Sequence, residues 1–147
     1  MTNKAVHLLG KFLTISILTS GKEEVIKLLN ILLEVKDPDE NTNDIIAGCY
    51  TKLIMLNESK LGRFITLMKY YTWCQKSRRF KDAIKALLDA GRVYPERKFE
   101  CDYCLARITG SPYLLKKSYD AINENYGTPK GLIYEIQDFY NSLTQSL

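Results

Sequence analysis

The sequence has few residues that break regular structure and few that carry out chemistry. Its 147 residues include 4 prolines, 8 glycines, one tryptophan and one histidine. It contains no Gly-rich phosphate loop, paired-aspartate motif or dinucleotide-binding fingerprint. The one histidine, His7, has no Ser or Cys partner in a recognised arrangement, so a nucleophilic triad would lack its base. These absences argue against an enzyme, and we expect neither catalysis nor a cofactor.

Cysteine is also scarce, and its positions do not suggest disulfides. Cys49, Cys74, Cys101 and Cys104 lie within helical patterns, without the loop-rich spacing of a secreted disulfide framework. Reduced thiols in the cytoplasm or the nucleus are the simplest interpretation. The pair Cys101-x-x-Cys104 could supply two zinc ligands, but a structural zinc site needs four, and the remaining candidates belong to other predicted helices. We therefore expect buried thiols and no metal.

Long hydrophobic runs are absent as well. The most apolar stretch, 5–18, is short and is interrupted by His7, Gly10 and Lys11. It also lacks the upstream basic region and the small-residue cleavage site of a signal peptide. We expect no membrane partner. A hydrophobic content of 46% against 26% charged residues is typical of a globular chain, and the length fits a single domain, 1–147.

Apolar residues recur at helical spacing along the whole chain, and no segment has a convincing strand pattern. The predicted helices are 4–18, 20–35, 43–57, two helices that flank a turn at Ser77, one around 99–108, and finally 112–126 and 129–143. The predicted fold class is therefore all-α, with about eight short helices. Because the connections are short, neighbouring helices should pack antiparallel, either as stacked helical hairpins or as a compact bundle.

Residues that begin and end helices support these boundaries. The segment 20–23 reads as a capping box, in which Ser20 caps a helix and Glu23 reaches back to it. The segment 37–43 reads as a loop, with Asn43 or Asp44 capping the next helix. Ser59 is the expected cap of the helix that follows. Two further sites combine a helix-ending Gly, a hydroxyl cap and a Pro at the first helical position, at 110–112 and 127–129.

The central stretch, 67–95, has two apolar stripes that meet at the turn, which indicates a pair of antiparallel helices. It resembles a tetratricopeptide repeat, a helix-turn-helix unit of 34 residues. Over about 64–97, the family's characteristic positions are occupied by Leu67, Phe80, Ala83, Leu87, Ala90 and Pro95. Tyr71 stands where the family has a small residue, and Cys74 stands where it has an aromatic one. The resemblance implies a partner-binding scaffold without catalytic residues.

Positive charge is concentrated in the same stretch. The net charge is +4, but residues 60–98 contain eleven Lys and Arg against three Asp and Glu. The flanking segments are mildly acidic, with six against eight before it and four against six after it. The candidate binding residues are Lys69, Trp73, Lys76, Arg78, Arg79, Lys81, Lys85 and Arg92.

This basic cluster has three possible explanations. It can be an ordinary solvated helix face, a surface for an acidic protein partner, or a surface for nucleic acid. Lysine and arginine would neutralise phosphates, and Trp73, Tyr70 or Tyr71 could stack on unpaired bases. Against this, Asp82 and Asp89 interrupt the pattern. We expect a non-enzymatic adaptor or regulatory protein that binds a protein partner. The alternative is an RNA- or DNA-binding protein, for instance a small viral regulator.

Both ends of the chain have more apolar surface than a solvated terminal helix needs. The first predicted helix is apolar on more than one side. The last predicted helix has a broad apolar face, formed by Leu132, Ile133, Ile136, Phe139, Tyr140 and Leu143. Large exposed apolar patches usually mark an interface, so we expect a homodimer formed through one of these ends.

Overall fold

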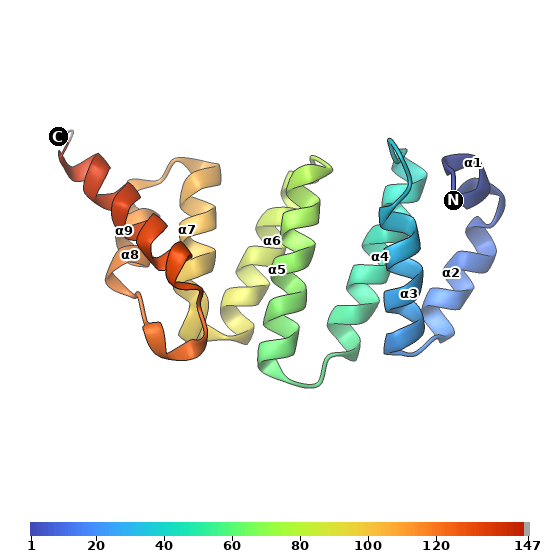
Figure 1. Cartoon of the computed structure of the whole chain (residues 1–147), viewed down its shortest axis with the longest axis horizontal. Coiled ribbons are helices and arrows are strands. Elements are labelled where there is room, and N and C mark those ends of the chain that lie inside the picture. The colour runs from blue at the N-terminus through green and yellow to red at the C-terminus, as the bar shows by residue number, and fades with distance from the viewer. Residues whose placement is uncertain (146–147) are drawn as a thin grey trace. The chain divides into compact units, whose positions relative to one another are not determined.

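A computed structural model describes residues 1–145 of the protein, and this part of the chain is all-α (Figure 1). Within this range there are nine α-helices and two short 3₁₀ turns, and no strand. The predicted fold class is confirmed. The chain divides into two compact units, Met1–Arg78 and Arg79–Leu147, each described separately below. The single domain expected from the sequence stays a prediction.

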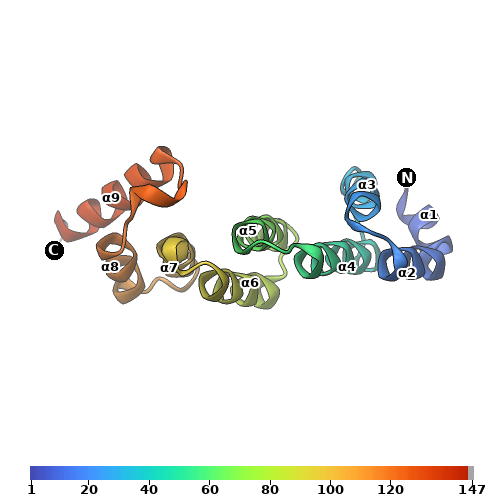
Figure 2. The ribbon, with the colours of Figure 1, turned by 90° about the horizontal axis from the view of Figure 1, so that it is seen from below.

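Unit 1 is organised around α4, against which α1, α2, α3 and α5 all pack. Figures 1 and 2 show α3 lying alongside α4. Its helices are α1 (Asn3–Leu8), α2 (Gly10–Thr19), α3 (Lys22–Leu33), α4 (Glu40–Leu56) and α5 (Lys60–Lys76). The buried core is formed by Val6, Leu13, Ile17, Val25, Leu29, Leu32, Val35, Ile45, Ile46, Cys49, Tyr50 and Leu53.

The first predicted helix is in fact two helices, and this raises the number from about eight to nine. The backbone leaves the helical conformation at Leu9 (φ −95°, ψ 5°), immediately before Gly10. Glycine is among the residues least favourable in a helix interior, so a bend at this position costs little. With this break, Val6 of α1 and Leu13 of α2 both reach the core of unit 1.

Two predicted helix starts in unit 1 are wrong. The N-cap of α3 is Gly21, without a side-chain hydrogen bond, because Ser20 closes α2 by donating its N–H to the carbonyl of Ser16. The helix α4 begins earlier than predicted, at Glu40, because Asp39 caps it by accepting from the N–H of Thr42 at 2.8 Å. The second half of the predicted loop 37–43 is therefore helical.

The predicted cap of α5 is confirmed. The hydroxyl of Ser59 accepts a hydrogen bond of 2.9 Å from the N–H of Gly62. The connection before it is fixed by Asn57, which is 7% exposed and donates to the carbonyl of Leu53 and to the hydroxyl of Thr66, both at 2.8 Å. These bonds satisfy polar groups in the short connection between α4 and α5.

Unit 2 is built around α7, which packs against α6 and α8, while α8 packs against α9. Its elements are α6 (Phe80–Val93), η1 (Pro95–Arg97), α7 (Lys98–Thr109), α8 (Pro112–Asp120), η2 (Glu124–Tyr126) and α9 (Lys130–Gln145). One core cluster of this unit contains Phe99, Tyr103, Ala106, Leu115, Ile133 and Ile136.

Two helix boundaries were predicted from a Gly, a hydroxyl residue and a Pro in succession, and the first of them, at 110–112, is confirmed in full. Gly110 is left-handed (φ 70°), and the Ser111 hydroxyl accepts from the N–H of Leu114 at 3.2 Å. At the second, Gly127 is also left-handed (φ 88°), but Thr128 does not act as the predicted cap. Its hydroxyl donates to the Glu100 carboxylate at 2.7 Å, and α9 begins only at Lys130.

The predicted turn at Ser77 is present, because α5 ends at Lys76 and α6 begins at Phe80, with Arg78 in the left-handed region (φ 61°). The boundary between the two units falls in this turn, so the two helices of the predicted hairpin belong to different units. Ala83 and Leu87 are fully buried. The resemblance to a tetratricopeptide repeat stays a prediction.

Candidate functional site

The outer side of α2 is unusually apolar. Because Leu13 and Ile17 occupy core positions, the opposite side of α2 points away from the core. Three large apolar residues of α2 are strongly exposed, Phe12 (68%), Ile15 (60%) and Leu18 (66%), and so is Leu8 (74%), the last residue of α1. We call these four residues the α2 face. The N-terminal segment is apolar on more than one side because one side packs into the core and another side is exposed.

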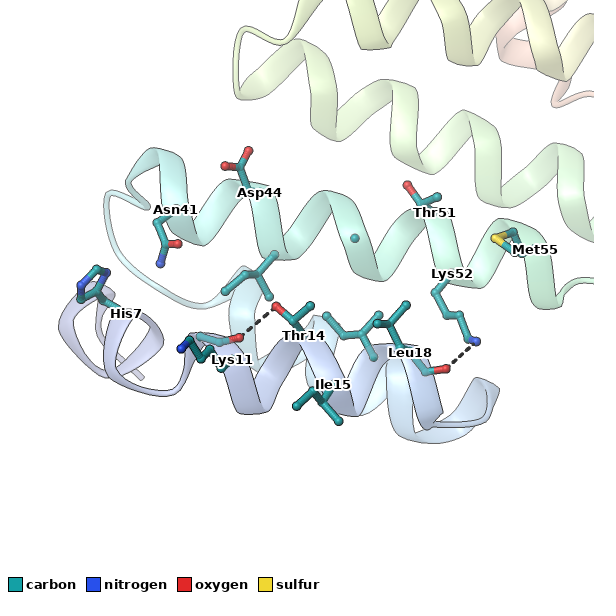
Figure 3. Close-up of a pocket in the computed structure, with 14 residues that line it drawn as sticks. His7, Lys11, Thr14, Ile15, Leu18, Asn41, Asp44, Thr51, Lys52 and Met55 are labelled. Carbon is teal, nitrogen blue, oxygen red and sulfur yellow. Dashed lines mark hydrogen bonds between the residues drawn. The ribbon is translucent and has the colours of Figure 1, made fainter.

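A groove of about 880 Å³ adjoins the α2 face and runs between α2 and α4, within unit 1 (Figure 3). Asn41 lines it near the start of α4 and Met55 near the end. At 1.5 Å per residue, the helix between them is about 21 Å long. We call this cavity the α2/α4 groove.

The groove owes part of its space to a glycine inside α4. A Cβ atom added to Gly48 would meet a single neighbour within 4 Å, the Cδ1 atom of Ile17 at 4.0 Å. The close approach of α2 and α4 does not require glycine here. The missing side chain leaves open volume where a larger residue would fill the groove.

The hydroxyl and ammonium groups beside the groove bond to backbone carbonyls. Thr14 donates to the carbonyl of Gly10 and Thr51 to that of Ala47, both at 2.9 Å. Lys52 extends from α4 and donates to the carbonyl of Leu18 at 3.0 Å (Figure 3). The polar atoms of these three side chains are thus satisfied locally, and the groove offers mostly apolar contact. Its charged lining residues are Lys11, Asp44 and Lys52.

The basic residues predicted as a binding surface do not all lie in one unit. Lys69, Trp73, Lys76 and Arg78 belong to unit 1, whereas Arg79, Lys81, Lys85 and Arg92 belong to unit 2. Within unit 2, some of this charge is neutralised by neighbours on the same helix. Arg79 lies 3.9 Å from Asp82, and Arg92 lies 3.4 Å from Asp89.

Three of the predicted residues do come together, in a second groove of unit 1 of about 520 Å³. Lys69, Trp73 and Lys76 line it from α5, and Leu33 and Pro38 line it from the end of α3 and the loop that follows. We call it the α3/α5 groove. The Trp73 ring is partly buried and packs against the core, with ring centroids 6.0 Å from Tyr70 and 5.7 Å from Tyr50.

The thiols are buried or partly buried. Cys49, Cys74 and Cys101 are buried, and Cys104 is partly exposed. Burial raises the pKa of the Cys49 thiol to about 12 and also raises that of Cys101. Among residues 1–145, no three His, Cys, Asp or Glu side chains lie close enough together to hold a metal ion.

Sequence reasoning identified the apolar character of α2 but missed the groove. Its second wall comes from α4, where Gly48, Thr51 and Met55 give no amphipathic signal of their own. The glycine within a helical pattern is the one feature that could have indicated a cavity.

No helix within residues 1–145 combines the length and the apolar character needed to cross a membrane. Comparisons with protein-family models, with curated proteins and with solved structures found no match to this chain.

Proposed function

We propose that this chain is a non-enzymatic adaptor or regulatory protein that binds a protein partner through the α2 face and the α2/α4 groove. The observation that carries the proposal is the joint exposure of four large apolar side chains, three on α2 and one at the end of α1. If each has on the order of 150 Å² of side-chain surface, the exposed part is about 400 Å². A patch of this size is often functional, and leaving it in water is unfavourable.

The shape of the site suggests the form of the partner. A groove between two packed helices, about 21 Å long, matches a partner helix of about 14 residues. Apolar residues on one face of that helix would enter the groove beside Gly48 and Ile17. Lys11 and Lys52 outnumber Asp44 in the lining, which favours acidic residues at the flanks of the partner helix.

Nucleic-acid binding remains the alternative proposal. It is less well supported because the basic residues that motivate it are divided between the two units, and two of them lie within 4 Å of aspartates. A cytoplasmic or nuclear location is part of the main proposal, because the four thiols fit a reducing compartment.

Affinity capture from the cells that produce the protein tests the proposal. The tagged chain is compared with a Phe12→Glu/Ile15→Glu variant and with Gly48→Leu, which fills the groove. The matched control is Tyr134→Glu, at an exposed position of α9 (59%) in unit 2. We expect a partner that the wild type and the control retain and both α2/α4 variants lose. A partner set that is identical for all four proteins would contradict the proposal.

A second copy of the chain is one possible partner, as the sequence suggested. The predicted apolar face of α9 is largely internal, because Ile133 and Ile136 are buried in the core of unit 2. Phe139 and Leu143 remain about two-fifths exposed. Sedimentation should therefore show either a monomer or a dimer that the Phe12→Glu substitution dissociates. A dimer that survives this substitution would place the interface elsewhere.

A further inference from the structure

The α3/α5 groove combines an apolar floor with positive charge. Trp73 and Tyr50 are among its aromatic lining residues, and Leu33, Val35 and Pro38 are among its aliphatic ones. Lys69 and Lys76 are its two charged lining residues, and no carboxylate is among the residues that line it. A ligand that fits this chemistry has an apolar group for the floor and negative charge for the rim.

The two lysines are placed at a regular distance along one helix. Lys69 and Lys76 are seven residues apart on α5, or two turns, which is about 10.5 Å along the axis. Thr72 and Trp73 lie between them on the same side. Both lysines are exposed, and neither forms a salt bridge within residues 1–145. Asp39, which follows the lining residue Pro38 in the sequence, accepts a hydrogen bond from the N–H of Thr42 at 2.8 Å as the cap of α4.

We propose that the α3/α5 groove is a second protein-binding site, which takes an acidic helical segment. The segment carries two carboxylates seven residues apart, one for each lysine, and apolar residues between them that contact Trp73. This site is lined by α3, the loop after it and α5, with Ile46 and Tyr50 from α4, whereas the α2/α4 groove is lined by α1, α2 and other residues of α4. Two separate sites in one unit would let the chain bridge two partners.

The geometry favours a peptide over single-stranded nucleic acid. The Trp73 ring is nearly parallel to that of Tyr70 (interplanar angle 14°) and also packs against Tyr50. It is therefore part of the core packing, whereas a stacked base needs a well-exposed ring face. Two lysines in the lining would also neutralise few phosphates, and phosphate contacts supply most of non-specific affinity.

The single tryptophan gives a direct readout, because its fluorescence reports on this groove alone. The probe is an alanine-based helical peptide of about 15 residues, with two Glu seven positions apart and two Leu between them. The same peptide with Gln in place of Glu is its control, and oligouridine tests the nucleic-acid alternative. We expect the Glu peptide to shift the Trp73 emission in a saturable way and to bind more weakly at higher salt.

Reversing the charge of the two lysines tests whether the peptide binds in this groove. In a Lys69→Glu/Lys76→Glu variant, affinity for the Glu peptide should fall roughly threefold to tenfold or more. The same peptide with Lys in place of Glu should bind this variant better than the wild type. Lys81→Glu, in unit 2, and Gly48→Leu, in the other groove, should leave the titration unchanged. Gly48→Leu fills the α2/α4 groove, on which the proposed function rests. Peptide binding that persists in this variant therefore tests the α3/α5 groove independently of the proposed function.

Three results would overturn the inference. The first is equal binding of the Glu and Gln peptides, which would remove the role of the lysines. The second is saturable binding of oligouridine without binding of the Glu peptide, which would assign the groove to nucleic acid. The third is no change in Trp73 emission with any probe.

Discussion

The ammonium group of Lys52 donates a hydrogen bond of 3.0 Å to the backbone carbonyl of Leu18, and so ties α4 to the last turn of α2. The last carbonyls of a helix have no partner within the helix, and they attract positive charge. α2 has no basic residue in its own last turn. The cation is supplied by the neighbouring helix across the α2/α4 groove.

Replacing Lys52 by Met removes this donor and keeps most of the aliphatic side chain. We expect a small loss of stability, about 0.5–1 kcal/mol, since the bond is exposed to solvent. Amide hydrogen exchange in the last turn of α2 should become faster. Lys27→Met, at an exposed position of α3, serves as the control. Unchanged exchange at the end of α2 would show that the bond does not hold this helix.

The sequence predicted the helices themselves well, and its errors lie mainly at the helix ends. Ser59 and Ser111 were predicted correctly because each is the nearest candidate cap before an apolar run. The roles of Ser20, Asp39 and Thr128 were not predicted correctly. At each of these helix ends, more than one residue can act as the cap, or the side chain has another hydrogen-bond partner. Thr128 shows this most clearly, since its hydroxyl donates to Glu100, a residue 28 positions earlier in the chain.

The candidate site was predictable only in part, for a related reason. The apolar pattern of the N-terminal helix indicated a helix that is either packed on several sides or lies in an interface, and it could not decide between the two. The groove beside it depends on which helix packs next to α2, and that is decided by tertiary structure. For the basic cluster, spacing predicted surface exposure but not the division between two units.

A second prediction concerns the buried carboxylate of Glu100, which is 4% exposed. It forms an ion pair with Arg97 and accepts a hydrogen bond of 2.7 Å from Thr128. Thr128→Val keeps the shape and removes the hydroxyl, so we expect a loss of about 1–3 kcal/mol in unfolding by urea. Glu100→Ala should cost more, about 3–5 kcal/mol, because it leaves the partly buried Arg97 without its partner. Thr144→Val, on the exposed end of α9, is the control; equal effects of the two Val variants would refute the role of this bond.

A third prediction concerns alkaline pH. Burial and a hydrogen bond to the Glu135 carboxylate raise the pKa of Tyr103 to about 12, from an ordinary value of 10.0. The folded state therefore keeps this proton at pH values where the unfolded state loses it. The resulting stability is complete below pH 10 and is lost as the pH rises toward about 12.

Thermal unfolding across this range, with wild type and Tyr103→Phe compared, measures the effect. The melting temperature of the variant should fall less steeply with pH than that of the wild type. Tyr113→Phe, at a position 71% exposed, should follow the wild type. Parallel curves for all three proteins would show that Tyr103 keeps an ordinary pKa.

A fourth prediction concerns the thiols. Because Cys49 and Cys101 are buried and their pKa values are raised, they should react with alkylating reagents only after unfolding. Cys104, which is partly exposed, should react first. Treatment with a chelator should leave the melting temperature unchanged, since we expect no structural zinc. Stoichiometric zinc in the purified protein, or a melting temperature lowered by the chelator, would refute this expectation.

Site-specific photo-crosslinking tests the proposed interaction surface most directly. A photoreactive phenylalanine analogue is placed at Phe12 on the α2 face, and at Tyr134 in unit 2 as the control, in cells that produce the protein. The proposed function predicts a discrete crosslinked product from position 12, to a partner protein or to a second copy, which Gly48→Leu abolishes. It predicts no such product from position 134. A product from position 134 alone, or one from position 12 that persists when the groove is filled, would contradict it.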